Sequence, residues 1–286
     1  MTERIIALVD GSGYAASVCD HAAWMAKGSG AGVELLHVLG RREAEGQQDL
    51  SGAIALGART ALLEELAALD AQRARLMTEQ GRVLLEDSRQ RIAAAGVAET
   101  ATRLRHGDLL EAVAEAERGA AAITIGKRGA AADFASGHLG SNLERVLRAS
   151  HRPVLVASRA FRPIRRALLA HDGGTSARKA VEHVAQSPLF RDVSVRLVTV
   201  GTDTAETRGW LAEAQLRLAG VGIATETALL PDSAHPETAL AGMIETDGFD
   251  MLIMGAYGHS RIRALIIGST TTALIRACKV PVLLLR

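Results

Sequence analysis

Short apolar runs recur along the chain, and helical patterns separate most of them. Residues 4–9 read Arg-Ile-Ile-Ala-Leu-Val, and Met251 to Met254 form a run that ends at Gly255. Runs this short, apolar at nearly every position, predict strands buried on both faces of a sheet. The other predicted strands are 33–39, 101–105, 122–125, 153–157, 164–170 and 197–200. Strands alternating with helices in this way predict an α/β fold with a parallel sheet covered on both faces.

One segment breaks the alternation. Residues 50–95 consist largely of Ala, Leu, Glu, Arg and Gln with almost no helix breakers, which predicts one or two long amphipathic helices. A polar linker, 41–49, precedes them and Gly96 closes them. Their Arg and Glu side chains are expected to form a solvated face. The helices could extend a domain interface or recruit a protein partner.

The pattern then starts again. Asp172 matches Asp10 at an offset of 162 residues (172 − 10), whereas Gly255 matches Gly126 at 129 (255 − 126). The first copy therefore holds about 33 extra residues, which lie in the long helical segment. We predict two domains, 1–160 and 161–286, with a helical insertion at about 44–95 in the first.

The composition argues against several kinds of partner and site. Apolar residues make up 48% of the 286 residues, aromatic residues only 3%, and the formal net charge is +1. A nearly neutral chain gives no electrostatic reason to expect nucleic acid or an acidic membrane surface as a partner. Cys19 and Cys278 are too few for a disulfide framework or a zinc site and suit a reducing compartment. Without a leader pattern or an apolar run of ~20 residues, we expect a cytoplasmic protein.

Candidate chemistry is concentrated after the predicted strand at 251–254. The spacing is Gly255-x2-Gly258-x9-Gly268-Ser269, and a helical pattern begins at Gly268. Glycines allow backbone amides to approach a ligand closely, and a helix start offers unpaired N–H groups, so this arrangement suits an anion. The glycines could instead serve only tight turns, and the serine could serve only as an N-cap.

The first copy carries a variant of the same spacing. Gly126-Lys127-Arg128-Gly129 is followed by Gly140-Ser141, with ten residues between Gly129 and Gly140 instead of nine. Lys127 and Arg128 would add positive charge beside a bound anion, or would be solvated.

A rival motif occurs near the N-terminus. Residues 11–16, Gly-Ser-Gly-Tyr-Ala-Ala, follow a predicted strand and match the dinucleotide pattern G-x-G-x-x-A. Asp10 would place a carboxylate against the pyrophosphate, and the second copy lacks the pattern, so we reject this motif. The chain also has no G-x-x-x-x-G-K-[ST] loop.

The string Met-Gly-Ala-Tyr-Gly-His-Ser-Arg at 254–261, with Gly268-Ser269, resembles the nucleotide-binding signature of the universal stress protein family. The resemblance covers both copies apart from the insertion. It implies two tandem flavodoxin-like or Rossmann-like domains, each a five-stranded parallel sheet in the order 3-2-1-4-5 with helices on both faces. Strands 1 and 4 are then neighbours, and ligands bind at this switch point. The apolar final strands, 153–157 and 281–285, are expected to pair across the domain interface as an intramolecular pseudo-dimer, with a homodimer of chains as a further expectation.

The resemblance implies an adenine nucleotide, ATP, as the ligand, with magnesium near Asp172. The backbone of Thr199 and Val200 would face the adenine, Asp172 would lie near the ribose or the magnesium, and the glycines with Ser269 would hold the phosphates. His259 lies in the same loop, but without an identifiable acidic partner it suggests no catalytic role. The implied binding residues of the second copy are Asp172, Thr199, Val200, Gly255, Gly258, His259, Gly268, Ser269 and Thr270. Those of the first copy are Asp10, Val38, Gly126, Gly129, Gly140 and Ser141.

The resemblance implies a stress-response regulatory protein rather than an enzyme. No general base is evident, so any ATP hydrolysis should be slow and incidental. Two alternatives stay open. One is a scaffold of the same fold with one or both pockets empty, the first copy being the weaker match. The other is an adenylyl-transferring enzyme, whose phosphate loop is only half matched by residues 172–176.

Overall fold

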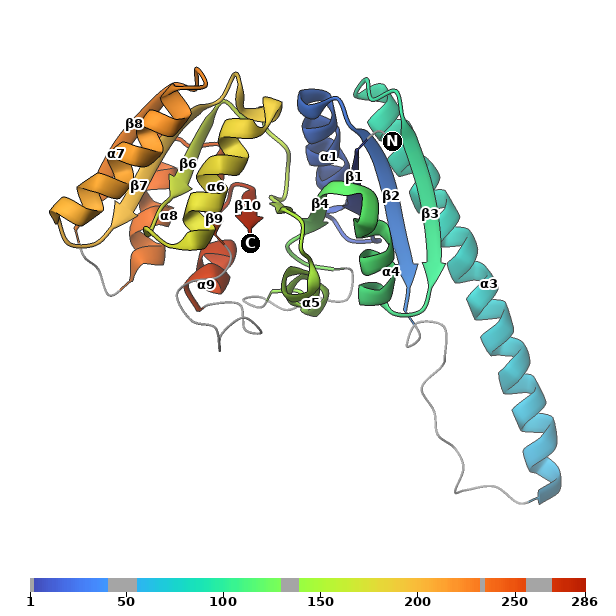
Figure 1. Cartoon of the computed structure of the whole chain (residues 1–286). Coiled ribbons are helices and arrows are strands. Elements are labelled where there is room, and N and C mark those ends of the chain that lie inside the picture. The colour runs from blue at the N-terminus through green and yellow to red at the C-terminus, as the bar shows by residue number, and fades with distance from the viewer. Residues whose placement is uncertain (1–2, 41–55, 130–138, 232–234, 256–268) are drawn as a thin grey trace.

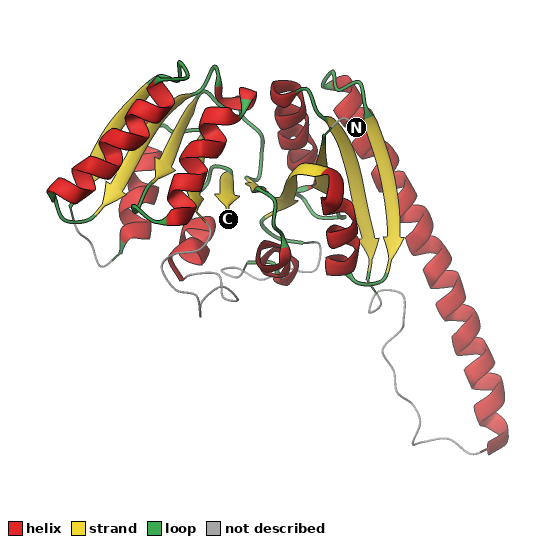
Figure 2. Ribbon diagram, viewed as in Figure 1, coloured by secondary structure: helices red, strands yellow, loops and turns green. Residues whose placement is uncertain are grey.

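The computed structural model describes residues 3–40, 56–129, 139–231, 235–255 and 269–286. It shows strands and helices alternating through the chain, with the helices on both faces of one sheet (Figure 1, Figure 2). We call the part from β1 to β5 the first half and the part from β6 to β10 the second half.

The first half begins with a strand and alternates throughout. Its elements are β1 (Arg4–Leu8), α1 (Ala15–Ser29), β2 (Gly32–Leu39), α3 (Leu56–Ala94), β3 (Thr100–His106), α4 (Leu109–Ala116), β4 (Ala120–Gly126), α5 (Ser141–Ala149) and β5 (Val154–Ala157). The five predicted strands are all confirmed, with bounds that differ by up to two residues.

The second half repeats the order of the first. Its elements are β6 (Arg166–Ala170), α6 (Thr175–Gln186), β7 (Ser194–Val200), α7 (Ala205–Ala219), β8 (Thr225–Leu230), α8 (Pro236–Asp247), β9 (Met251–Gly255), α9 (Ser269–Ala277) and β10 (Val282–Leu285). The predicted domain boundary between residues 160 and 161 lies between β5 and β6.

All ten strands join one sheet in the order β3-β2-β1-β4-β5-β10-β9-β6-β7-β8. Each half therefore has the expected order 3-2-1-4-5, and within each half the neighbouring strands are parallel. The halves meet where β5 pairs antiparallel with β10, with Leu155 opposite Leu283. The predicted pairing of the two final strands is thus confirmed.

The sheet separates two apolar cores, and each core runs through both halves. Successive strand residues alternate between them: Ile5 belongs to one core and Ile6 to the other, because side chains of a strand point alternately to opposite faces. Helices α1, α3, α6 and α7 cover the first face, and α4, α5, α8 and α9 cover the second. Burial on both faces explains why the strands are short continuous apolar runs.

The sequence predicted one or two long helices at 50–95. The structure has a single helix here, α3, of 39 residues. Gly96 follows it with φ +88°, a left-handed conformation that favours glycine at a helix end. Only the C-terminal part packs on the sheet, through Leu85 and Ile92. The N-terminal part projects well beyond the ends of the strands (Figure 1).

The β5–β10 pairing generates a prediction about cooperativity. Val282 and Leu284 are buried on the β10 face that packs against α9 and its neighbours, with exposures of 0% and 2%. Replacing both with Lys buries unpaired charge in a core shared by the halves, so we expect a loss of about 3–5 kcal/mol or more in the free energy of unfolding. Both halves should lose stability together in denaturant titrations followed by hydrogen exchange.

The matched control is Leu216→Lys, because Leu216 on α7 is 74% exposed and tolerates a charge. Loosening confined to the second half in the double lysine variant would contradict a shared core.

Candidate functional site

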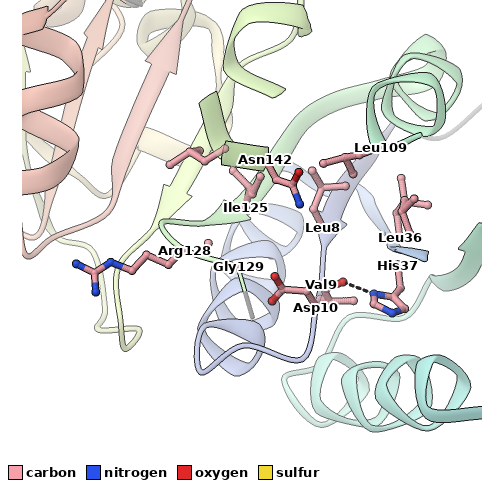
Figure 3. A pocket seen from close by; sticks show the side chains of 13 residues that line it. Leu8, Val9, Asp10, Leu36, His37, Leu109, Ile125, Arg128, Gly129 and Asn142 are labelled. Atoms are coloured by element: carbon pink, nitrogen blue, oxygen red, sulfur yellow. Dashed lines mark hydrogen bonds between the residues drawn. The ribbon is translucent and has the colours of Figure 1, made fainter. Parts of the chain in front are cut away.

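The switch point of the first half is the place where β1 and β4 lie side by side and their connections leave to opposite faces. Beyond the C-terminal ends of these strands the structure has a cavity of about 70 Å³ (Figure 3). Its lining includes four of the six residues predicted for this half: Asp10, Val38, Gly126 and Gly129. The two others, Gly140 and Ser141, begin the helix α5, whose residues Asn142 and Leu143 also line the cavity.

Asp10 lies two residues after the end of β1 and starts the turn into α1. Its Oδ1 accepts a hydrogen bond from the backbone N–H of Ser12 at 3.1 Å, so part of its role is local turn formation. Its other oxygen faces the glycine turn, because a Cβ added to Gly129 would lie 3.1 Å from Oδ2. The carboxylate therefore lies against the loop that follows β4.

The glycines allow three segments to converge. A Cβ on Gly126 would lie 2.7 Å from the Cβ of Tyr14, at the start of α1. A Cβ on Gly140 would lie 3.3 Å from the backbone nitrogen of Gly129, and the Gly140 N–H donates to the Lys127 carbonyl at 3.2 Å. The turn after β4, the start of α1 and the start of α5 are thus in close contact, and larger residues would separate them.

Helix α5 begins against this turn without a side-chain cap. Gly140 is its N-cap and supplies no side-chain acceptor, and Ser141 is its first residue. The first N–H groups of a helix have no partners within the helix and carry the positive end of its dipole. At this position they suit an anion such as a phosphate group.

His37 lines the same cavity and was not predicted as a site residue. Its Nδ1 lies 2.8 Å from the Val9 carbonyl oxygen, which can only accept, so Nδ1 carries the proton (Figure 3). The other side of the ring packs on α3, where a Cβ on Gly81 would lie 2.9 Å from the ring. The sequence signal for this contact is a glycine in the middle of a long helix.

The second half repeats several of these contacts at equivalent positions. Asp172 Oδ1 accepts from the Gly174 N–H at 2.9 Å, as Asp10 does from Ser12. A Cβ on Gly255 would lie 2.6 Å from the Cβ of Ser176, just as Gly126 lies against Tyr14. Packing against the helix after the first strand is therefore one reason for the first glycine in each half.

Thr199 corresponds to His37 and makes the same kind of bond. Its hydroxyl donates to the His171 carbonyl at 2.6 Å and is buried, so the Thr199 side chain is already used within the sheet. Val200 ends β7 and is half-buried. Of the other predicted residues, Ser269 and Thr270 begin α9, and Gly258, His259 and Gly268 lie outside the described residues.

Lys127 was expected either to add positive charge beside a bound anion or to be solvated. It is not among the residues that line the cavity. Its Nζ donates instead to the carbonyl of Cys278, which directly follows α9 in the second half. A cation at the C-terminal end of a helix is favoured by the helix dipole. Burial lowers the pKa of the Lys127 amine to about 8. Arg128 does line the cavity, although its side chain extends away from Asp10 and Asn142 (Figure 3).

An implied magnesium ion can be compared with the acidic groups available. Among the described residues, no three His, Cys, Asp or Glu side chains gather as a metal site. Mg²⁺ is usually held by one or two carboxylates together with substrate phosphates and water. Asp10 and Asp172 therefore fit an ion that arrives with a nucleotide, and they do not form a resident metal centre.

A second hollow, of about 670 Å³, lies between α6 and α7. It is lined by Trp210 and by charged groups of both signs, of which Glu182 and Arg217 form an ion pair at 2.7 Å. It contains none of the predicted binding residues, and no motif in the sequence indicated it.

The repeated strand order and the switch-point cavity define the class of this molecule, a pair of tandem Rossmann-like α/β domains. A model of the universal stress protein family matches residues 1–158 and 203–286. The chain belongs to the universal stress protein family.

Individual relatives agree with this assignment. The chain is 34% identical over 288 residues to universal stress protein Slr1230 of Synechocystis, covering 99% of this chain and all of that protein. A universal stress protein of Archaeoglobus fulgidus has a similar structure over 100% of this chain and 99% of its own, with a TM-score of 0.75 at 21% identity. A putative universal stress protein of Pseudomonas aeruginosa gives a TM-score of 0.64 at 16% identity, covering 99% of this chain and 93% of its own. None of the described helices is long and apolar enough to cross a bilayer.

The contact of Lys127 with the second half generates a prediction about pH. The amine has a pKa of about 8 in the folded protein and an ordinary value of 10.5. Between these values the unfolded chain binds more protons, so the folded state gains stability as pH rises. We expect the free energy of unfolding to rise across this window relative to Lys127→Met, by a few kcal/mol at most.

Both proteins in this comparison should carry Cys278→Ala. Burial raises the pKa of the Cys278 thiol to about 11, and its titration changes stability in the opposite direction. A difference between the two proteins that stays flat from pH ~8 to ~10.5 would show that Lys127 is not buried at the interface.

Proposed function

We propose that the protein is a stress-response regulator that binds an adenine nucleotide, ATP, at the switch points of its two halves. The observation that carries the proposal is the convergence at one cavity of an acidic strand end, a glycine turn and the uncapped start of α5. Helix starts and glycine turns hold phosphates through backbone amides, and open α/β sheets bind ligands at this edge. The family resemblance of the loop at 254–261 supports an adenine nucleotide over other anions.

In this proposal each group has a separate task. The backbone amides of the Gly126–Gly129 turn and the start of α5 hold the phosphates. Asp10 lies close enough to the turn to interact with a ribose hydroxyl or with a magnesium ion bound to the phosphates. Val38, near the end of β2, also lines the cavity and suits the adenine. The corresponding groups of the second half are Asp172, Val200, Gly255 and the start of α9.

We infer regulation rather than catalysis. Asp10 is the only carboxylate among the described residues that line the first cavity, and one of its oxygens already accepts the Ser12 N–H. A hydrolase needs a group that positions and activates water. Any ATP turnover should therefore be slow. We also infer a cytoplasmic location, which the two buried free thiols of Cys19 and Cys278 support.

A scaffold function is the second candidate, and a specific observation favours it. Gly126 and Gly255 are accounted for by packing against Tyr14 and Ser176, and Lys127 contacts the other half instead of the cavity. These contacts would be needed in a protein that binds no nucleotide.

Nucleotide binding can be tested by thermal stability. A ligand at about 100 times its Kd stabilises the folded state by about 2.7 kcal/mol. For a chain of this size we expect Mg-ATP to raise Tm by on the order of 5 °C. Gly129→Val should remove binding in the first half, because its methyl groups would occupy the space beside Asp10, and Gly268→Val with Ser269→Ala should remove it in the second.

The control is Gly242→Val, since a Cβ at Gly242 meets nothing within 4 Å. It should keep the full Tm increase. Mass analysis of nucleotide released from purified protein counts the occupied sites in each variant. An unchanged Tm with saturating Mg-ATP, and no released nucleotide, would leave the scaffold as the function.

A further inference from the structure

Four apolar residues form a stripe along the projecting part of α3. Leu62, Leu69, Leu76 and Val83 recur every seven residues, and the last three have exposures of 55%, 64% and 53%. Side chains seven residues apart lie nearly above one another on a helix, because seven residues make almost two turns. We call these four residues the α3 stripe.

The α3 stripe points away from the body of the protein. The residues of α3 that pack on the sheet, Leu85, Ser88 and Ile92, lie on nearly the opposite side of the helix when 100° is taken per residue. No residue from 62 to 80 is buried. The stripe is therefore not part of the buried core of its own chain. Exposed apolar positions at a seven-residue spacing are typical of a helix that pairs with another helix.

We propose that the α3 stripe binds the α3 stripe of a second copy of this chain, with the two helices antiparallel. The projecting segment 62–83 has 22 residues and is about 33 Å long, and it extends past the strand ends, so a second helix can lie along it without meeting the sheet (Figure 1).

Charge selects the antiparallel direction. The first part of the segment carries Glu64, Glu65 and Asp70 without a basic residue, whereas the following part carries three arginines and one glutamate, Glu79, which lies 3.5 Å from Arg82. A parallel pair would place parts of like net charge together, whereas an antiparallel pair places the net acidic part of each helix against the net basic part of the other, with Glu65 opposite Glu79 as the exception.

Arg73 supports the same choice. It lies beside the stripe, between Leu69 and Leu76, on the flank shared by Leu66 and Gln80. In a parallel pair, the two Arg73 side chains would meet. In an antiparallel pair centred near residue 71, Arg73 of each copy lies next to Leu69 and Asp70 of the other, and two arginine–aspartate pairs form by symmetry.

The main test is the mass of the full chain in solution, measured by analytical ultracentrifugation over a range of concentrations. The wild type should be a dimer. Leu69→Glu with Leu76→Glu should weaken dimerisation on the order of 100-fold or more, because it places four carboxylates in an apolar seam. The variant chain should stay folded and melt in a cooperative transition, since neither side chain packs on its own chain, and its Tm should no longer depend on protein concentration.

The matched control is Leu216→Glu, which places a charge on another exposed leucine outside α3. It should leave the dimer intact. A monomeric wild type, or a dimer that persists in Leu69→Glu/Leu76→Glu, would overturn the proposal.

Two further variants test the orientation. Asp70→Arg alone should weaken the dimer about tenfold, and adding Arg73→Asp should restore it. Gln72→Cys should form a disulfide between copies under mild oxidation, because residue 72 lies near the centre. Glu65→Cys should cross-link only when mixed with Glu79→Cys. Efficient cross-linking of Glu65→Cys with itself would rule out the antiparallel arrangement.

Discussion

The antiparallel pairing of β5 with β10 is the contact on which the rest of the structure depends. Each strand is apolar along its whole length and buried on both faces, so neither half could expose it as the edge of a separate sheet without exposing apolar surface and unpaired backbone groups. When β5 and β10 pair with each other, the apolar surface and the backbone groups of both edges are buried together. It also makes the two cores continuous across the junction, so helices of both halves pack on a single sheet.

This shared sheet fixes the relation between the two switch points. They lie beyond the C-terminal ends of strand pairs β1–β4 and β6–β9, separated by the central strands β5 and β10. The turn after β4 contacts both sides: Gly126 and Gly129 face the first cavity, and Lys127 between them reaches Cys278 at the end of α9. Under the proposed function, a ligand that shifts this turn also shifts a residue bound to the helix whose start belongs to the other site. The halves are therefore joined by backbone pairing and by a side chain next to the site.

The sequence was informative where a single local constraint determines the structure. Apolar runs ending at Asp10 and Gly255 predicted the strands, because burial on both faces requires such runs. The residues that matter by contact were less visible. His37 enters the cavity because its Nδ1–H binds the Val9 carbonyl on the neighbouring strand, and Thr199 makes the corresponding bond with a different side chain. Lys127 follows a glycine in the predicted motif, and only the position of the second half shows where its amine goes. These contacts join residues distant in the chain, so spacing alone could not predict them.

For α3, the sequence predicted the length of the helix but not which part of it packs on the sheet. Its composition predicted a long helix, but the side chains that face the sheet occur only from about Gly81 onward, where that glycine allows the helix to approach His37 and Leu104. Before Gly81 the helix keeps an apolar stripe that its own chain does not bury. Helices of this length gain most of their stability from packing of an apolar face. Under the proposed dimer, a second copy covers the regularly spaced leucines of this helix, whose charges, acidic first and then largely basic, fit a reversed copy of itself.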